Sequence, residues 1–148
     1  MKRYKQGIYR PIHQEKYRGS QPICYRSSLE LRFMRFCDTN SNIITWGSES
    51  VVLPYIRPTD GKLHRYFVDN NLVIKDKEGT LHKYLVEIKP YKQTLPPSSI
   101  NRKNKGTLLK EQFTYAINMA KFQAAKQWCA KQGWKFMIIT EKDLNKLK

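Results

Sequence analysis

The 148-residue chain carries 28 lysines and arginines against 12 aspartates and glutamates, which gives it a formal net charge of +16. In a chain with room for one hydrophobic core, this charge predicts a polyanionic partner, with nucleic acid as the first candidate and an anionic membrane as the second. With no run of about 20 apolar residues and no signal-peptide core, we expect neither a membrane span nor secretion, and three widely spaced cysteines predict neither disulfides nor zinc.

The first 23 residues are basic and polar, and they show neither helical nor strand periodicity. They fit a solvated arm, and they fit equally a strap that follows a phosphate backbone and lays Tyr4, Tyr9 and Tyr17 on sugars or bases. We therefore expect residues 1–24 to form a basic N-terminal arm and residues 25–148 to form a single domain.

A helix is predicted from Ser27 to Asp38, where apolar residues recur at helical spacing. Ser27 and Glu30 have the spacing of a capping box, which would explain Glu30 structurally. Glu30 also lies one turn before Phe33 and Met34, at the edge of the apolar stripe. We favour a functional role for its carboxylate over the purely structural one.

Two short strands are predicted at residues 43–46 and 51–56, separated by the turn 47–50. Pro54 indicates that the second strand lies at an edge or bends there. Glu49 in the turn could lie near a functional site, although an exposed loop carboxylate is the commoner case.

The stretch from His64 to Lys89 predicts two strands joined by a turn at residues 76–79. Alternation places Glu87 and Lys89 on one face of the second strand, and the first strand brings Asp69 toward them. Like charges at close range need a cation between them, and carboxylates suit Mg²⁺ or Mn²⁺. This pattern predicts metal-dependent hydrolysis of a phosphodiester.

The remainder predicts a basic loop rich in proline and serine at residues 90–106, which we expect to lie over the substrate or to be an ordinary flexible loop. A long helix follows at residues 107–131, then a strand at 134–139 and a short helix from Thr140. The core stripe of the long helix is expected to contain Phe113, Ile117, Ala120 and Ala124.

Asp69 followed by Glu87-Ile88-Lys89 resembles the signature of the restriction-endonuclease-like PD-(D/E)XK superfamily. The segments 25–30, 64–69 and 86–90 further resemble the head-completion nucleases of tailed phages, which are relatives of TnsA-type transposase endonucleases. The resemblance runs from about Tyr25 to about Leu144. It implies an α/β (α+β) fold with an αβββαβ core, in which helices flank a central mixed sheet, and the predicted order of elements agrees.

The resemblance also implies a catalytic site made of Glu30, Asp69, Glu87 and Lys89. The three acids and the main-chain carbonyl of Ile88 would hold Mg²⁺, for which Mn²⁺ would substitute. Lys89 would hold the attacking water and stabilise the charge on the phosphate. DNA contacts are expected from six basic residues, and accessory roles from a glutamine and a tyrosine: Arg26, Arg65, Lys92, Arg102, Lys103 and Lys105, then Gln112 and Tyr115.

The residues and the resemblance together predict a Mg²⁺-dependent DNA endonuclease. The resemblance alone implies that it finishes packaged double-stranded DNA ends during phage head completion. Its partners would include phage portal, neck or packaging proteins, in the host cytoplasm or the virion head and neck. Two alternatives stay open: a nuclease for transposon ends or repair, and a non-catalytic basic protein that binds DNA ends on a nuclease fold.

Overall fold

The computed structural model describes residues 6–98 and 104–146. Its N-terminal half contains β1 (Gly7–Tyr9), the 3-10 helix η1 (Gln14–Lys16), β2 (Ile23–Tyr25), α1 (Ser28–Thr39), β3 (Ile43–Ser48), β4 (Val52–Ile56) and β5 (Leu63–Phe67). The rest contains β6 (Asn70–Lys75), β7 (Leu81–Ile88), the 3-10 helix η2 (Tyr91–Thr94), α2 (Lys105–Gln132), β8 (Lys135–Ile139) and α3 (Glu141–Lys146). Among all the described residues, 6–98 and 104–146, no helix combines the length and the hydrophobicity that a membrane span needs.

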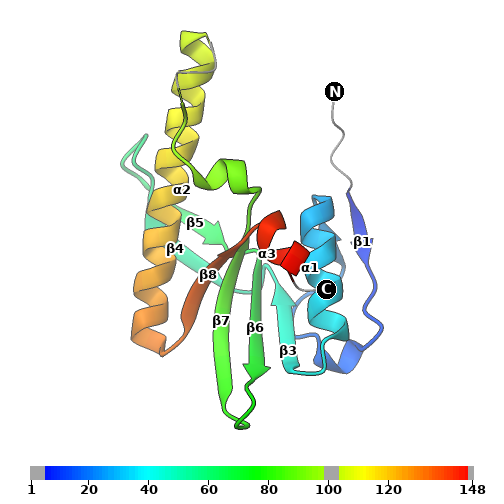
Figure 1. Cartoon of the computed structure of the whole chain (residues 1–148). Coiled ribbons are helices and arrows are strands. Elements are labelled where there is room, and N and C mark those ends of the chain that lie inside the picture. The colour runs from blue at the N-terminus through cyan, green and yellow to red at the C-terminus, as the bar shows by residue number, and fades with distance from the viewer. Residues whose placement is uncertain (1–5, 99–103, 147–148) are drawn as a thin grey trace.

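A four-stranded mixed sheet in the order β3-β6-β7-β8 forms the centre of the molecule (Figure 1). Only β7 and β8 run parallel, as expected for strands joined by the crossover helix α2. Helix α1 packs on one face of the sheet, whereas α2 and the β4–β5 hairpin pack on the other. The order α1, β3, β6, β7, α2, β8 is the restriction-endonuclease-like core, so the predicted fold class is confirmed.

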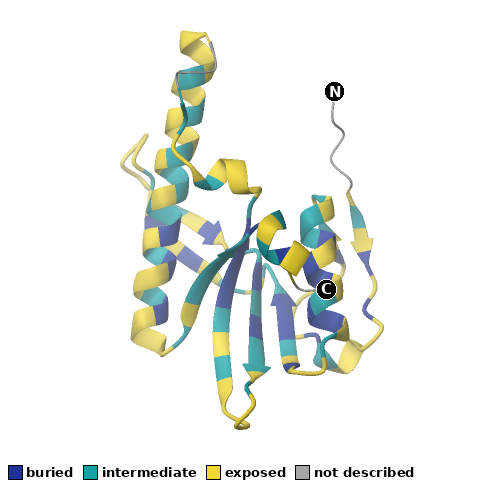
Figure 2. Cartoon of the chain, in the orientation of Figure 1, coloured by how far each residue is buried: buried dark blue, intermediate teal, exposed yellow. Residues whose placement is uncertain are grey.

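The alternation predicted for β7 decides which side chains face each half of the core. Val86 and Ile88 pack in the cluster under α1, and Leu85 packs in the cluster under α2. Both faces of β7 are covered, which explains why its last four residues are buried (Figure 2). Glu87 shares the side of Leu85 and is therefore carried into the interior.

The predicted strand that starts at His64 is in fact two strands that belong to different sheets. β5 pairs with β4, whereas β6 pairs with β3 and β7. Val68 and Asp69 form the step between them, and their backbones bond to the β3–β4 connection: Val68 N donates to Val51 O, and Glu49 N donates to Asp69 O. Asp69 thus lies at a break between two sheets rather than within a strand.

Residues 6–25 pack against the sheet and α1 instead of extending as a free arm. Tyr9 and Tyr17 are buried and meet the ring of Trp46 edge-on, with centroids 6.0 Å and 4.8 Å away. Neither tyrosine is therefore available to stack on DNA, and Tyr4 lies outside the described residues. Burying aromatic surface against α1 and β3 is the physical reason for this difference from the sequence-based expectation.

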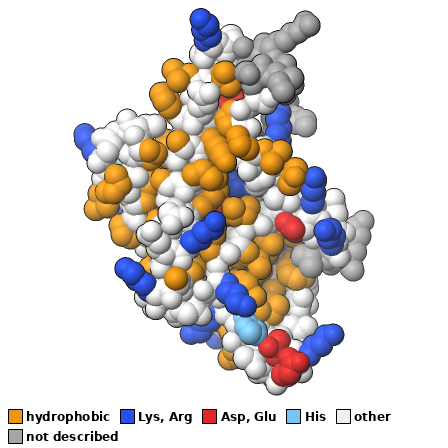
Figure 3. Space-filling view, turned by 60° about the vertical axis from the view of Figure 1, so that its left-hand side comes forward, with side chains coloured by type: hydrophobic (Ala, Val, Ile, Leu, Met, Phe, Trp, Pro, Cys, Tyr) orange, Lys and Arg blue, Asp and Glu red, His pale blue; other side chains and the backbone are white. Residues whose placement is uncertain are grey.

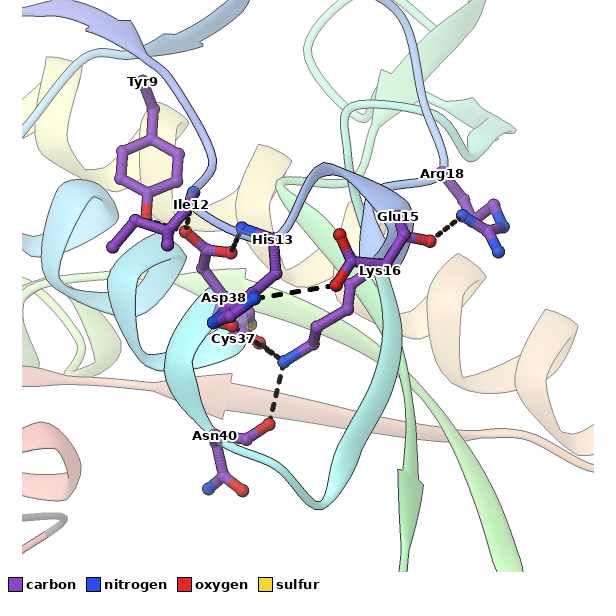
Figure 4. Close-up of polar contacts among 9 residues, drawn as sticks. All are labelled: Tyr9, Ile12, His13, Glu15, Lys16, Arg18, Cys37, Asp38 and Asn40. Carbon is purple, nitrogen blue, oxygen red and sulfur yellow. Dashed lines mark hydrogen bonds and ion pairs between the residues drawn. The ribbon is translucent and has the colours of Figure 1, made fainter.

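Asp38 and Lys16 hold this N-terminal segment at the C-terminal end of α1 (Figure 4). The Asp38 carboxylate accepts hydrogen bonds from Tyr9 Oη at 2.6 Å and from the backbone N–H groups of Ile12 and His13 at 2.7 Å and 2.9 Å. Lys16 Nζ donates to the carbonyls of Cys37, Asp38 and Asn40 at 2.7–2.9 Å. An ammonium at the end of a helix satisfies carbonyls that lack intrahelical partners and offsets the negative end of the helix dipole.

Helix α2 begins beyond the sheet, and its first turns project away from the body of the molecule (Figure 1). Phe113 was predicted to be in the core stripe, but it lies on this projecting half and is 49% exposed. The other three predicted residues, Ile117, Ala120 and Ala124, are partly buried and pack against the core as expected. The buried residues of α2 are Phe122, Ala125 and Cys129. Figure 3 shows the face that carries α2, on which hydrophobic side chains spread between separate Lys and Arg side chains.

Candidate active site

Asp69 and Glu87 meet at the C-terminal end of β7. Asp69 Oδ2 accepts a hydrogen bond of 2.8 Å from the backbone N–H of Ile88, which fixes its carboxylate beside the strand. The Glu87 side chain projects from β7, is almost fully buried, and has Oε2 3.4 Å from Lys89 Nζ. The structure therefore brings together Asp69, Glu87 and Lys89, as the sequence predicted, although Asp69 arrives from the step between β5 and β6.

Tyr66 is a member of this cluster that we did not predict from the sequence. Its ring is buried under α2, and its hydroxyl donates a 2.6 Å hydrogen bond to Glu87 Oε1. Burial raises the pKa of the Tyr66 hydroxyl, and the Glu87 carboxylate raises it further, so the phenol stays protonated and serves as a donor. Tyr66 comes from β5, in a different sheet from Glu87, so strand periodicity could not reveal the contact.

Glu30 lies in the first turn of α1. Its backbone N–H donates to Ser27 Oγ at 3.1 Å, which is the expected N-cap, but its carboxylate accepts from the backbone N–H of Arg26 at 3.1 Å instead of completing the box at Ser27. Burial raises the pKa of Glu30, the hydrogen bond and charge of Arg26 lower it, and the negative charges of Glu49 and Glu87 raise it again. Glu30 is thus electrostatically linked to the Glu87 carboxylate of β7.

Two carboxylates beside one ammonium leave the cluster with an excess of acidic groups. Burial raises the pKa of the Asp69 carboxyl well above its usual range, and the negative charge of Glu87 adds to this effect. The Ile88 N–H and the Lys89 ammonium act in the opposite direction and do not cancel it. A carboxyl that resists ionisation beside other acids is the situation that a bound cation relieves.

The donor atoms suit a hard divalent cation. Carboxylate oxygens are the ligands that Mg²⁺ and Mn²⁺ prefer, and the hydrogen bonds from Ile88 and Tyr66 engage only one oxygen of each carboxylate. Within residues 6–98 and 104–146, no three His, Cys, Asp or Glu side chains lie close enough to hold an ion as they stand. Binding an ion through Asp69, Glu87 and Glu30 together would therefore require one of these side chains to turn.

The predicted DNA-binding and accessory residues are distributed around the molecule. Arg65, Lys92 and Lys105 are exposed, whereas Arg102 and Lys103 lie outside the described residues. Arg26 is also exposed, but its guanidinium pairs with the Glu49 carboxylate. Glu49 therefore lies at the edge of the site, and the sequence left this possibility open.

Neither accessory residue has a described contact with the carboxylates. Gln112 is exposed on the projecting half of α2. Tyr115 lines a hollow of about 540 Å³ between α2 and residues 92–98, and Lys92 is part of its wall. Their accessory roles stay predictions, as does the role of the Ile88 carbonyl.

Comparison with known proteins places this chain among nucleases. Residues 40–141 match the family described as TnsA-like endonuclease N terminal. The match includes Asp69, Glu87 and Lys89, and it begins after Glu30. The chain is also 39% identical over 145 residues to a protein named head completion nuclease from Enterobacteria phage T4, in an alignment that covers 95% of this chain and 94% of that protein.

Proposed function

The chain belongs to the TnsA-like endonucleases and to the head-completion nucleases, and from this membership we propose that it cleaves double-stranded DNA with Mg²⁺. The observation that carries the proposal is the pairing at the end of β7. There, two carboxylates lie beside one ammonium in a chain of net charge +16. A basic surface attracts DNA, and the carboxylates give a cation a place beside the phosphate.

Each residue would have a separate task. Asp69 and Glu87 would hold Mg²⁺, with Glu30 and the Ile88 carbonyl completing its ligands, and Mn²⁺ would substitute for it. When bound, the ion supplies Lewis acidity toward the phosphodiester. Lys89 Nζ lies 3.4 Å from Glu87 Oε2, which places the ammonium where it would orient the attacking water and stabilise the negative charge that develops on the phosphate.

The biological setting follows from the relative. Its name supports a role for this chain in phage head completion, in which the enzyme would trim or finish packaged DNA ends. Such work would take place in the infected cell or at the virion head and neck, with portal, neck or packaging proteins as partners. In a phage that lacks the protein, we expect full heads that do not join tails, and normal particles would contradict this role.

A plasmid-nicking assay tests the chemistry. The wild-type chain should nick supercoiled plasmid in Mg²⁺ or Mn²⁺ and stop when a chelator is added. Asp69→Asn and Glu87→Gln should each abolish nicking while DNA affinity stays close to that of the wild type. Asp60→Asn is a matched control, because Asp60 is exposed in the β4–β5 turn and bonds to His64.

Nicking by the Asp69 variant at the wild-type rate would falsify the assignment. A wild-type chain that binds DNA without nicking it would favour the alternative of a non-catalytic end-binding protein.

A further inference from the structure

Arg26 and Glu49 form an ion pair at the edge of the candidate site. The guanidinium Nη1 donates to Glu49 Oε1, and the two side chains are 62% and 34% exposed. The pair is therefore more open to solvent than Glu87, whose side chain is 7% exposed. A ligand from solvent can therefore reach this pair more readily than it can reach Glu87.

The backbone ties both partners to the acidic residues of the site. The Arg26 N–H donates to Glu30 Oε2 at 3.1 Å, and the Glu49 N–H donates to the carbonyl of Asp69 at 3.0 Å. The hydrogen bond and charge of Glu49 raise the pKa of the Arg26 guanidinium, and the negative charges of Glu30 and Asp69 raise it further. Arg26 is thus a cation of the carboxylate cluster, although Glu49 holds its side chain.

Glu49 keeps this position in an unfavourable backbone conformation. Within the described residues it is the one non-glycine residue with positive φ, at +53°. Such a conformation is uncommon for a residue with a side chain, and it persists where the surrounding structure imposes it. Here the neighbouring Ser50 hydroxyl bonds to Asn71 Oδ1 at 2.7 Å, and a Cβ on Gly47 would lie 2.4 Å from the Arg18 carbonyl. The turn is packed into the shape that presents the Glu49 carboxylate to Arg26.

A guanidinium binds phosphate with the same pair of donors that it offers to a carboxylate. Because Glu49 Oε1 accepts from Arg26 Nη1, a DNA phosphate can use this nitrogen in a bidentate contact only after Glu49 releases it. We propose that Glu49 is a latch on Arg26, so that the Glu49 carboxylate and a phosphate of the DNA compete for one guanidinium at the entrance of the site. Glu49 is then a positioning residue that lowers the affinity for DNA until a phosphate displaces it. This inference rests on the proposed function, because DNA is the ligand that would release the latch.

The test is a double-mutant cycle on DNA affinity, measured by fluorescence anisotropy with a short labelled duplex in chelator at fixed salt. Glu49→Gln keeps the shape of the side chain and removes its charge, so binding should tighten about fivefold, within the usual range of pairwise coupling. In an Arg26→Gln background the same change should tighten binding by less than about 1.5-fold, because the released group is absent.

Controls separate the latch from a general charge effect and from misfolding. Glu78→Gln removes a charge from the exposed β6–β7 turn, at the opposite end of β7 from Lys89, and should leave affinity nearly unchanged. Melting temperatures of all variants check that each is folded. Equal gains from Glu49→Gln in both backgrounds, or weaker binding in the single variant, would overturn the latch. A loss of Mg²⁺ affinity in Glu49→Gln with unchanged DNA affinity would also overturn it and make Glu49 a metal ligand.

Because the cycle is run in chelator, its outcome is independent of catalysis. If wild type nicks plasmid but the cycle shows no coupling, the latch fails and the nuclease stands. If the cycle shows coupling but the wild type does not nick plasmid, the proposed chemistry fails instead.

Discussion

The Tyr66 hydroxyl donates a 2.6 Å hydrogen bond to Glu87 Oε1 and thereby joins the β4–β5 hairpin to the strand that carries the candidate site. The bond occupies one oxygen of a buried carboxylate, which limits the rotation of Glu87 and leaves Oε2 on the side of Lys89. Lys121 of α2 lies over the same ring, with Nζ 5.6 Å from its centroid. The position of Glu87 thus depends on three elements that are separate in the sequence.

Tyr66→Phe should weaken metal binding and nicking by about ten- to a hundredfold, the usual cost of removing a group that orients a metal ligand. The ring remains to fill the core, so the fold should survive. The measurement is calorimetry with Mn²⁺, together with nicking rates. Tyr55→Phe is a close control, because Tyr55 is also buried and lies under Lys121, but its hydroxyl bonds only to Arg57 within the described contacts. Equal losses in both variants would assign the effect to packing under α2.

Asp69→Asn should stabilise the metal-free protein at neutral pH while it removes activity. Burial and the charge of Glu87 raise the folded-state pKa of Asp69 above its unfolded value. The folded state therefore holds this proton more tightly, and stability falls as pH rises from the unfolded pKa through the folded one. Asparagine does not titrate and can still accept from the Ile88 N–H.

The melting temperature of Asp69→Asn in chelator should exceed that of the wild type by about 2–4 °C at neutral pH, which corresponds to about 1 kcal/mol in a domain of this size. The difference should shrink as pH falls toward the unfolded pKa. Added Mg²⁺ should stabilise the wild type and leave the variant unchanged. A variant that is less stable than the wild type at neutral pH would show that the ionised Asp69 carboxylate does not destabilise the folded state.

Asp38→Asn should have the opposite effect on stability. Burial alone would raise the pKa of Asp38, but the hydrogen bonds from Tyr9, Ile12 and His13 outweigh burial and lower it. Its stabilisation is therefore present above the unfolded pKa and is lost only as pH falls through the lowered folded pKa. Since three donors would face a neutral amide, we expect a loss of about 2–3 kcal/mol at neutral pH.

Denaturant unfolding at pH 7 and at acid pH checks the effect of Asp38→Asn, which should diminish at the lower pH. Because Asp38 lies at the far end of α1 from Glu30, nicking by folded Asp38→Asn should stay near that of the wild type. Unchanged stability at pH 7 would mean that the N-terminal segment does not depend on this carboxylate.

The parts of the structure that sequence could predict are those set by local periodicity. The alternation at Leu85, Val86 and Glu87 survives because both faces of β7 are covered, so each side chain has a fixed side. The step at Asp69 was hidden because Val68 and Asp69 satisfy their backbone groups through the β3–β4 connection, a tertiary contact that no local pattern encodes. The same reason explains why Tyr66 and the pairing of Arg26 with Glu49 were not predicted, although Arg26 was expected at the DNA and Glu49 was allowed near the site.

In the N-terminal segment, the sequence-based prediction assigned side chains to the wrong partner. Its lysines and tyrosines suggested contact with a phosphate backbone, yet Lys16 satisfies carbonyls of α1, and Tyr9 and Tyr17 pack on Trp46. Composition identifies which groups need partners, and it does not say whether the partner is nucleic acid or the protein itself. Where the nuclease domain begins, expected at Tyr25, stays a prediction.

Glu30 and Ser27 allow the structural and the functional roles of the α1 N-terminus to be separated. Ser27 caps the helix through its side-chain oxygen, and Glu30 accepts from the Arg26 backbone. Ser27→Ala removes the cap and should cost about 1 kcal/mol of stability with little change in nicking. Glu30→Gln keeps an oxygen for the Arg26 N–H, so stability should hold, whereas nicking should fall about ten- to a hundredfold if the carboxylate assists the metal. In Ser27→Ala the melting temperature should therefore fall while the nicking rate holds, and in Glu30→Gln the nicking rate should fall while the melting temperature holds. If Glu30→Gln instead loses stability and retains nicking, Glu30 is a helix-capping residue, and the candidate site is reduced to Asp69, Glu87 and Lys89.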